Sequence, residues 1–161
     1  MVSIKAAINK YKIGLIILSG LILVVVLFIF YFKYLEKNSN YSTGFIEINQ
    51  KIINIEIASS PINQYFGLSK RKSLCADCGM LFIFTDKQIR EFVMRNMEFP
   101  LDIIFIADGR IINIAENLEP EGNNPINKYK SIAPADKVLE LNGGYCQKHG
   151  IEVGDSVIFN D

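Results

Sequence analysis

Apolar and polar residues are distributed in two different ways along this chain. Residues 13–32 form an uncharged run of 20 residues, and a helix of that length, rising about 1.5 Å per residue, spans roughly the 30 Å of a bilayer core. From residue 45 onward, short apolar runs are separated by turn-forming residues, which is typical of strands. The pattern therefore predicts one transmembrane helix followed by a mainly β domain.

The strands of the β domain follow from the spacing of apolar side chains. Residues 51–58 alternate between apolar and polar side chains, as a half-buried strand does, and Asn49-Gln50 would join them to residues 45–48 in a hairpin. Residues 80–84 and 101–107 are apolar on both faces and are expected in the middle of a sheet. Further strands are expected at 110–118, 137–141 and 156–159, the first of them joined to 101–107 by a turn at Asp108-Gly109.

Two short helices are expected between these strands. Ser60-Pro61 is typical of a helix start, with a serine cap before a proline whose fixed φ suits the first turn, and Gly67 would end that helix. Gly143-Gly144 would open a helical turn that ends near Gly150. Many short strands with one or two short helices predict a jelly-roll-like sandwich or a small barrel.

The apolar N-terminal run is interpreted as an uncleaved anchor. A signal peptide usually has only about 7–15 apolar residues and a small-residue cleavage site, and neither feature is present here. Three lysines precede the run and two follow it, which favours a cytoplasmic N-terminus and a domain outside the cytoplasm. The expected organisation is a cytoplasmic tail (1–12), a transmembrane helix in the lipid bilayer (13–32), a tether (33–44) and an exported, extracytoplasmic β domain (45–161).

The charge of the β domain argues against a nucleic-acid partner. Five lysines and one glutamate lie before residue 38, so the remaining 12 basic and 16 acidic residues give the domain a net charge of about −4. A protein that binds phosphate backbones needs the opposite balance. A protein or small-molecule partner remains open.

The chain has three cysteines and one histidine, and they fall into two pairs of the same spacing: Cys75 with Cys78, and Cys146 with His149. This set would complete a structural zinc site. The alternative is a disulfide between Cys146 and either Cys75 or Cys78, with one thiol left over. Inert buried thiols are the third alternative. The zinc and disulfide interpretations both require the two pairs to lie together. A thioredoxin-like role is not favoured, because the first pair leads directly into a strand and not into a helix N-terminus.

Five polar residues near apolar strands are candidates for ligand binding. Asp102 and Glu140 each interrupt an apolar run and could act together in acid–base chemistry, but we favour pairing with backbone groups or with Arg71 and Arg95. Arg95 and Asn96 could bind an anion or a carbonyl group, or simply end a strand.

Several motifs occur together between residues 45 and 159: Gly67-Leu68 with Arg71, Gly79-Met80-Leu81-Phe82, Phe92 with Met94 and Asn96, Pro100-Leu101-Asp102, Val138 to Leu141, and Gly150 to Asp155. In these motifs the chain resembles the bacterial and archaeal family known as domain of unknown function 192. It departs from the family pattern at Ser69, Val93 and Met97, where the pattern has Met, Trp and Thr. The resemblance implies a mainly β, jelly-roll-like domain that is usually exported or anchored, and it implies no reaction.

The expected function is a non-catalytic, membrane-anchored exported domain with a ligand-binding or envelope accessory role. The alternative is an enzyme of unknown reaction that uses Asp102 and Glu140 with Arg71 and Arg95. A binding or catalytic site would gather these side chains in one open pocket, whereas a structural role would leave them dispersed and individually paired.

Overall fold

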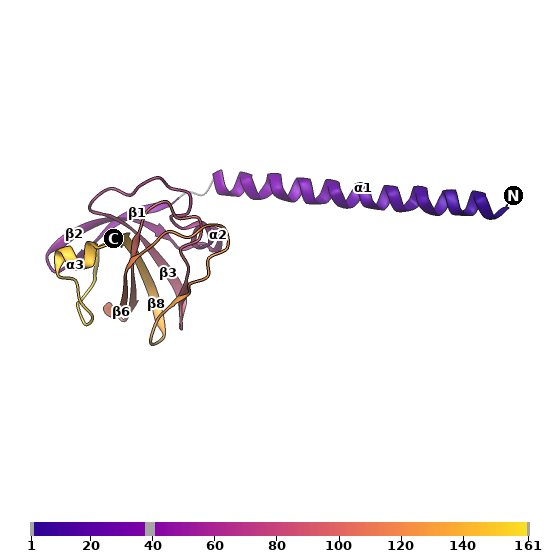
Figure 1. Cartoon of the computed structure of the whole chain (residues 1–161). Coiled ribbons are helices and arrows are strands. Elements are labelled where there is room, and N and C mark those ends of the chain that lie inside the picture. Colours follow the sequence, from indigo (N-terminus) through magenta and orange to yellow (C-terminus); the bar gives the residue numbers. More distant parts are fainter. Residues whose placement is uncertain (1, 38–40, 161) are drawn as a thin grey trace. The chain divides into compact units, whose positions relative to one another are not determined.

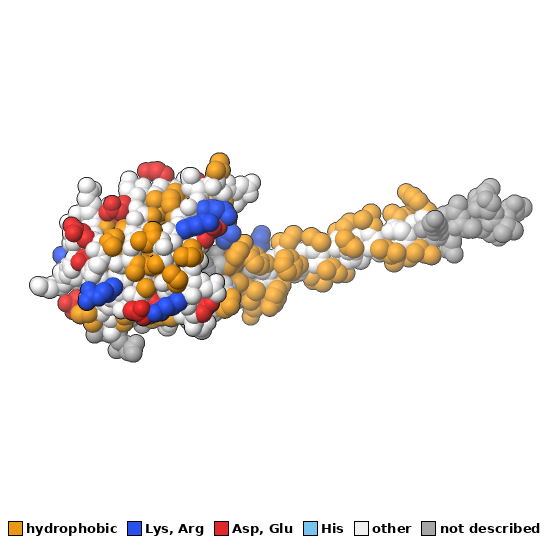
Figure 2. All heavy atoms as spheres, turned by 90° about the horizontal axis from the view of Figure 1, so that it is seen from below, with side chains coloured by type: hydrophobic (Ala, Val, Ile, Leu, Met, Phe, Trp, Pro, Cys, Tyr) orange, Lys and Arg blue, Asp and Glu red, His pale blue; other side chains and the backbone are white. Residues whose placement is uncertain are grey.

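The structure, a computed structural model, describes residues 2–37 and 41–160 and divides the chain into two units, Met1–Ser39 and Asn40–Asp161. The first unit contains helix α1 (Val2–Lys37), and the second contains all the strands formed by the described residues (Figure 1). Within α1, the segment Tyr11–Leu35 is long and apolar enough to cross a membrane. Apolar side chains cover this segment (Figure 2), so it could serve as a membrane anchor or as a signal sequence.

The β domain is built on one curled seven-stranded sheet that forms half of a barrel (Figure 1). Its strand order is β6-β5-β8-β3-β2-β1-β9. The pair β2–β3 is parallel, and helix α2 (Pro61–Phe66) lies in the crossover that a parallel pair requires. The strands are β1 (Ser42–Ile48), β2 (Lys51–Ala58), β3 (Cys78–Gln88), β5 (Leu101–Ala107), β6 (Arg110–Leu118), β8 (Ala135–Asn142) and β9 (Ile158–Asn160).

The remaining elements are short. Strands β4 (Glu91–Phe92) and β7 (Tyr129–Lys130) form a separate two-stranded sheet, and α3 (Tyr145–His149) follows β8. The mainly β fold class, the hairpin turn at Asp108-Gly109 and both short helices are confirmed. The sequence did not predict β4 and β7, because two residues are too few to show a strand period. The last strand begins later than expected, because Ser156 forms an isolated bridge with Arg110.

The sheet has a hydrophobic cluster on each face. Leu81 and Leu139 belong to the first cluster, and their strand neighbours Met80 and Val138 belong to the second. This alternation is what a strand imposes, since successive side chains point to opposite faces. The small sheet packs against the second cluster through Phe92 and Tyr129. The second face is therefore the one that the small sheet covers, whereas α3 packs its Tyr145 and Cys146 side chains against the first.

Candidate functional site

The carboxyl group of Glu140 is buried on the second face of the sheet. Glu140 lies opposite Met80 of β3 and Ile103 of β5, both members of the second cluster. It is 5% exposed, and its Oε2 atom has no hydrogen-bond partner among the described residues. Burial raises the pKa of Glu140 to about 8, and the charge of Arg71 opposes this rise only in part. The carboxyl group is therefore mostly uncharged at neutral pH.

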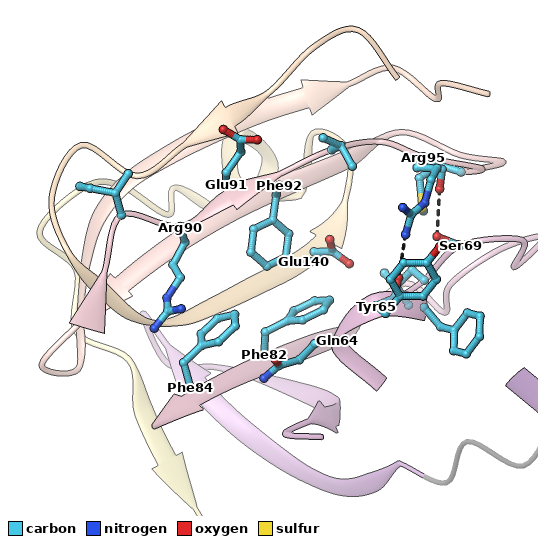
Figure 3. A pocket seen from close by; sticks show the side chains of 16 residues that line it. Gln64, Tyr65, Ser69, Phe82, Phe84, Arg90, Glu91, Phe92, Arg95 and Glu140 are labelled. Atoms are coloured by element: carbon cyan, nitrogen blue, oxygen red, sulfur yellow. Dashed lines mark hydrogen bonds between the residues drawn. The ribbon is translucent and has the colours of Figure 1, made fainter. Parts of the chain in front are cut away.

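A pocket of about 360 Å³ opens above this carboxyl group (Figure 3). Phe82 of β3 and Phe92 of β4 form its walls, with their rings edge to face and centroids 4.9 Å apart. In the close-up Glu140 lies next to these two rings, with Tyr65 and Arg95 on one side and Phe84 and Arg90 on the other. The aromatic part of the walls comes from α2, from β3 and from β4 of the small sheet. Gln64, Phe66, Gly67, Leu68, Ser69, Ile89, Glu91, Val93 and Met97 complete the lining.

The segment after α2 begins with Gly67, which has no side chain to fill the space next to Phe82 and Glu140. Gly67 ends α2 with φ at +50°, a conformation that side chains rarely adopt. A Cβ atom on Gly67 would lie 3.2 Å from Cζ of Phe82 and 3.9 Å from Oε2 of Glu140. Further along, the Ser69 hydroxyl donates to the backbone oxygen of Arg95 over 2.9 Å. This bond joins the α2 side of the pocket to the segment that carries Arg95.

Two arginines line the pocket, and they differ in how their charge is balanced. Arg90 forms an ion pair with Asp86 at 2.7 Å and donates to the backbone oxygen of Ala135 at 3.0 Å. Arg95 lies over the Tyr65 ring, 4.3 Å from its centroid, and donates to the Tyr65 backbone oxygen at 3.0 Å. In the described part of the chain, Arg95 forms no ion pair with a carboxylate. Arg95 therefore brings an unbalanced positive charge to the pocket.

Asp102, the predicted acid–base partner of Glu140, lies on the other face of the sheet. It is opposite Leu141 of the first cluster, whereas Glu140 is opposite Ile103 of the second. The Asp102 carboxylate accepts hydrogen bonds from the backbone N–H groups of Asn117, Gly144 and Cys146, at 2.7, 2.9 and 2.8 Å. Asp102 thus ties β6 and the start of α3 to β5 and does not face the pocket.

The other two polar candidates also have structural partners. Both guanidinium NH2 groups of Arg71 donate to the carboxylate of Glu56, at 2.6 and 2.7 Å, and this pair lies outside the pocket lining. Asn96 has φ at +52° and receives a backbone hydrogen bond from Lys70, which is the turn role expected for asparagine. Of the five predicted residues, the structure brings Glu140 and Arg95 together and leaves Arg71, Asn96 and Asp102 outside the pocket.

Comparison with known proteins places the β domain in a family. Residues 45–159 match the family model for domain of unknown function 192, described as Uncharacterized ACR. The chain belongs to this family. No curated protein matches the chain.

Two solved structures resemble this member of domain of unknown function 192 closely. A candidate transcription regulator from Sinorhizobium meliloti 1021 is 30% identical with a TM-score of 0.70, over 76% of this chain and 97% of that one. A protein of unknown function from Novosphingobium aromaticivorans DSM 12444 is 29% identical with a TM-score of 0.67, over 74% of this chain and 93% of that one. The predicted family is therefore confirmed, and neither description names a ligand or a reaction.

The cysteines of this family member pair differently from the prediction. Cys75 and Cys78 form a disulfide with each other, with Cα atoms 5.1 Å apart, so the predicted bond from Cys146 to either of them is wrong. Cys146 is a buried thiol in the first cluster, and burial together with the nearby Asp102 carboxylate raises its pKa. Within the described ranges, no three His, Cys, Asp or Glu side chains are grouped to hold a metal ion, so the zinc alternative with His149 gains no support.

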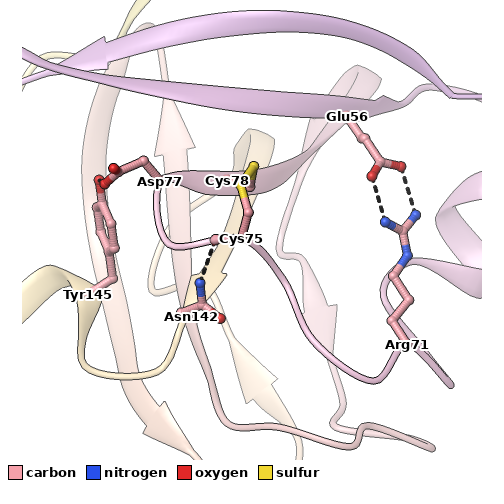
Figure 4. Close-up of a disulfide and its surroundings, with 7 residues drawn as sticks. All are labelled: Glu56, Arg71, Cys75, Asp77, Cys78, Asn142 and Tyr145. Carbon is pink, nitrogen blue, oxygen red and sulfur yellow. Dashed lines mark hydrogen bonds and ion pairs between the residues drawn. A yellow bond between two sulfur atoms is a disulfide. The ribbon is translucent and has the colours of Figure 1, made fainter.

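The two segments that carry these cysteines nevertheless lie side by side (Figure 4). The Tyr145 hydroxyl donates to the Asp77 carboxylate at 3.1 Å, and the Asn142 amide donates to the Cys75 backbone oxygen at 2.9 Å. Hydrogen bonds from the end of β8 and from α3 therefore make the connection that we expected from a metal or a disulfide. Cys146 takes no part in it, because its side chain lies in the core beneath α3.

The sequence did not predict the pocket walls of this domain. Phe82, Phe84 and Phe92 lie in or next to apolar runs, and such residues are indistinguishable from core residues by pattern alone. Val93, which stands where the family pattern has Trp, also lines the pocket. The one available signal was Glu140, a carboxylate that interrupts the apolar run from Val138 to Leu141.

Proposed function

We propose that this protein is a membrane-anchored module that binds a small organic acid, an apolar body carrying a carboxylate, in the pocket above Glu140. The observation that carries this proposal is the buried Glu140 carboxyl group with an oxygen that has no partner in the described part of the chain. Such a group lowers the stability of the fold unless a ligand forms a hydrogen bond with it, because a buried polar atom gives up its hydrogen bonds to water.

The state of Glu140 selects the kind of ligand. With a pKa of about 8, Glu140 keeps its proton in roughly nine-tenths of the molecules at pH 7. A protonated carboxyl group donates a hydrogen bond through its O–H. Arg95 adds N–H donors and a positive charge on the same pocket. The pocket therefore offers donors, and a carboxylate is the ligand group that accepts from both of them.

The side chains of the pocket walls indicate the character and size of the part of the ligand that carries the carboxylate. Phe82, Phe84 and Phe92 are aromatic and partly or fully removed from water, so they favour an apolar or aromatic body. A volume of about 360 Å³ is at the small end of ligand pockets, which run from roughly 300 to 1,000 Å³. The expected ligand is thus a molecule with about one ring, or a short branched chain, next to its carboxylate.

We also propose that α1 anchors the domain to a membrane with the pocket outside the cytoplasm. The apolar segment Tyr11–Leu35 supports the anchor, and the lysine balance around it supports the orientation. The Cys75–Cys78 disulfide also supports a β domain outside the cytoplasm, since disulfides persist in oxidising compartments and are rare in the cytosol.

Three probes that share one ring and differ in their polar group test the ligand class. Benzoate, benzamide and benzylamine would be titrated into the full chain in detergent micelles at pH 6.5, with binding followed by NMR shifts of the pocket phenylalanines. We expect benzoate to bind most tightly, benzamide less tightly because it lacks the charge that meets Arg95, and benzylammonium least. Tightest binding of benzylammonium would overturn the proposal, because it would mean that Glu140 acts as an anion.

Variants of Glu140 and Arg95 test whether these two hydrogen-bond donors bind benzoate. Between pH 6.5 and 9.5 the protonated fraction of Glu140 falls about thirty-fold, and benzoate affinity should fall with it. Glu140→Gln keeps an N–H donor and cannot ionise, so its affinity should not change over this pH range. Arg95→Gln should bind benzoate about tenfold more weakly and benzamide equally well. Glu56→Gln, outside the pocket, is the matched control and should bind as the unmodified chain does.

An enzyme that uses Glu140 as a general acid is the second candidate. The observation in its favour is the same pKa of about 8, which is close to the working pH that proton transfer requires. The titration samples test this candidate directly. Hydrolysis of benzamide to benzoate that is absent from Glu140→Gln would favour the enzyme, and unchanged probe after a day would favour the binding module.

A further inference from the structure

We infer that the Cys75–Cys78 disulfide is a thiol–disulfide exchange site that oxidises a dithiol partner, a peptide or protein segment with two neighbouring thiols. This activity is independent of the pocket above Glu140, because neither cysteine lines that pocket. It would be a second function of the same domain.

The first support is that the bond is accessible. Cys75 is exposed in the loop before β3, and Cys78, the first residue of β3, is half-buried. A sulfur atom must be reached in line with the bond before a thiolate can displace its partner. Cys75 is the more exposed residue of the pair, so its sulfur is the expected point of attack, and Cys78 is the expected leaving group.

The second support is that the loop does not need the disulfide to keep its shape. The backbone N–H of Asn54 donates to the Asp77 oxygen at 3.0 Å, and the N–H of Cys78 donates to the Cys75 oxygen at 3.2 Å. Side chains of Asn142 and Tyr145 hold the same loop from the other side (Figure 4). None of these four bonds involves sulfur, so the two thiols should stay close together after reduction.

The length of the crosslink points the same way. Cys75 and Cys78 are three positions apart, and in the chain-entropy account a disulfide that closes so short a loop constrains the unfolded chain less than a long-range one does. A bond with a small stabilising effect can open and close without unfolding the domain. Exposed disulfides are the labile ones in exchange chemistry, and Cys75 is exposed.

The third support is a hollow beside the bond. A cavity of about 560 Å³ is lined by both cysteines together with Thr43, Phe45, Glu56 and Arg71. Glu56 and Arg71 neutralise each other across 2.6 Å, so this wall presents polar groups with no net charge. The hollow would receive the residues of the partner chain that flank its attacking thiol.

The proposed reaction transfers two electrons from the partner to the domain. A thiolate of the partner attacks Sγ of Cys75, the Cys75–Cys78 bond breaks, and Cys78 leaves as a thiolate that takes a proton from water. The second thiolate of the partner then attacks the partner's first sulfur, which is bonded to Sγ of Cys75 in the mixed disulfide, and Cys75 leaves as a thiolate. The partner has gained a disulfide, and the domain has become a dithiol. The attacking thiol belongs to the partner, so the domain needs no helix N-terminus to activate a cysteine.

The test uses the full chain in detergent micelles and a reduced synthetic peptide with two cysteines separated by four residues. The reaction is stopped with acid, free thiols are alkylated, and both products are quantified by mass spectrometry. We expect one peptide disulfide to form for each Cys75–Cys78 bond lost, at least tenfold faster than with oxidised glutathione at equal concentration. A rate equal to or below that of glutathione would overturn the inference.

Two further measurements make the outcome specific. With a single-cysteine peptide, the mixed disulfide should lie on Cys75 with Cys78 alkylated, and linkage to Cys78 would overturn the assignment of the attacked sulfur. The Cys146→Ser variant, which can still donate to Asp102, should exchange at the unmodified rate. Circular dichroism of the reduced chain should retain the signal of the sheet. Loss of that signal would identify the bond as a structural crosslink and refute the exchange site.

Discussion

Replacing Glu140 by glutamine should stabilise the domain at neutral pH. The pKa of Glu140 rises from 4.5, the value for an exposed glutamate, to about 8 in the folded domain because of burial. Each unit of such a difference is worth about 1.4 kcal/mol of folding free energy. The full difference therefore corresponds to a penalty of about 5 kcal/mol, of which about 3 kcal/mol is present at pH 7.

The sign of the pH dependence follows from where the proton is held. Below pH 4.5 the folded and unfolded chains both hold the Glu140 proton, so the carboxyl group adds no penalty. Between pH 4.5 and about 8 only the unfolded chain releases the proton, and stability falls as the pH rises. Above about pH 8 both states are ionised and the penalty stays constant. Glutamine does not titrate, so the Glu140→Gln variant should lack this decline.

Urea unfolding of the full chain in micelles, followed by tyrosine fluorescence, measures the difference. The free energies of unfolding of the two proteins should be similar at pH 5 and should separate by several kcal/mol at pH 8. Glu56→Gln is a control of opposite sign, because the hydrogen bond from Arg71 lowers the pKa of Glu56. The stabilisation from Glu56 is present above pH 4.5 and is lost as the pH falls through its lowered pKa. An equal gap between Glu140→Gln and the unmodified chain at pH 5 and pH 8 would refute an uncharged, buried Glu140.

Three other changes test separate parts of the structure. Gly67→Ala should lower stability by about 1–3 kcal/mol in urea unfolding and weaken benzoate binding, because of the positive φ and the 3.2 Å approach to Phe82; unchanged binding would contradict the place given to Gly67. Asp102→Ala should cost about 3 kcal/mol or more, because three backbone N–H groups lose their acceptor, and it should leave the pH dependence due to Glu140 intact. Protease added to intact cells should digest the β domain and spare residues 1–12; protection of the domain would contradict the proposed orientation.

Local features of the fold were predictable because each depends on neighbours in the sequence. The Ser60 cap of α2 forms as expected, with its hydroxyl accepting from the Asn63 N–H at 3.2 Å. The turn at Asp108-Gly109 joins β5 to β6 as expected, since both residues adopt the positive φ that a tight hairpin turn needs. Family motifs then supplied the overall architecture, which no local rule would give.

The candidate site was only half predictable, because it depends on which face of the sheet each carboxylate occupies. Strand β5 is buried on both faces, so its sequence does not reveal which face Asp102 shares with other residues. The register between β5 and β8 decides the matter by placing Glu140 opposite Ile103. That register joins strands that are far apart in the chain. A shift of one residue would have put Asp102 and Glu140 on the same face.

The same kind of long-range geometry decided the disulfide. Sequence spacing allowed Cys146 to reach either Cys75 or Cys78, and the two segments do come together through Asp77 and Tyr145. The direction of the Cys146 side chain is set by α3, which packs it into the first cluster. Cys75 and Cys78 are then left to pair with each other, an outcome that cysteine counting did not weigh.

The stability of the domain offers a way to recognise the natural ligand of the pocket. A ligand present at one hundred times its dissociation constant raises stability by about 2.7 kcal/mol. That gain would offset most of the Glu140 penalty of about 3 kcal/mol at pH 7. A ligand that requires the Glu140 proton binds about a hundredfold more weakly at pH 10, where the gain falls to about 0.4 kcal/mol. A component of a cell extract that binds through the Glu140 carboxyl group should stabilise the unmodified chain at pH 7 and not at pH 10. The same component should stabilise the Glu140→Gln variant equally at both pH values. A component that stabilises the unmodified chain equally at both pH values binds elsewhere.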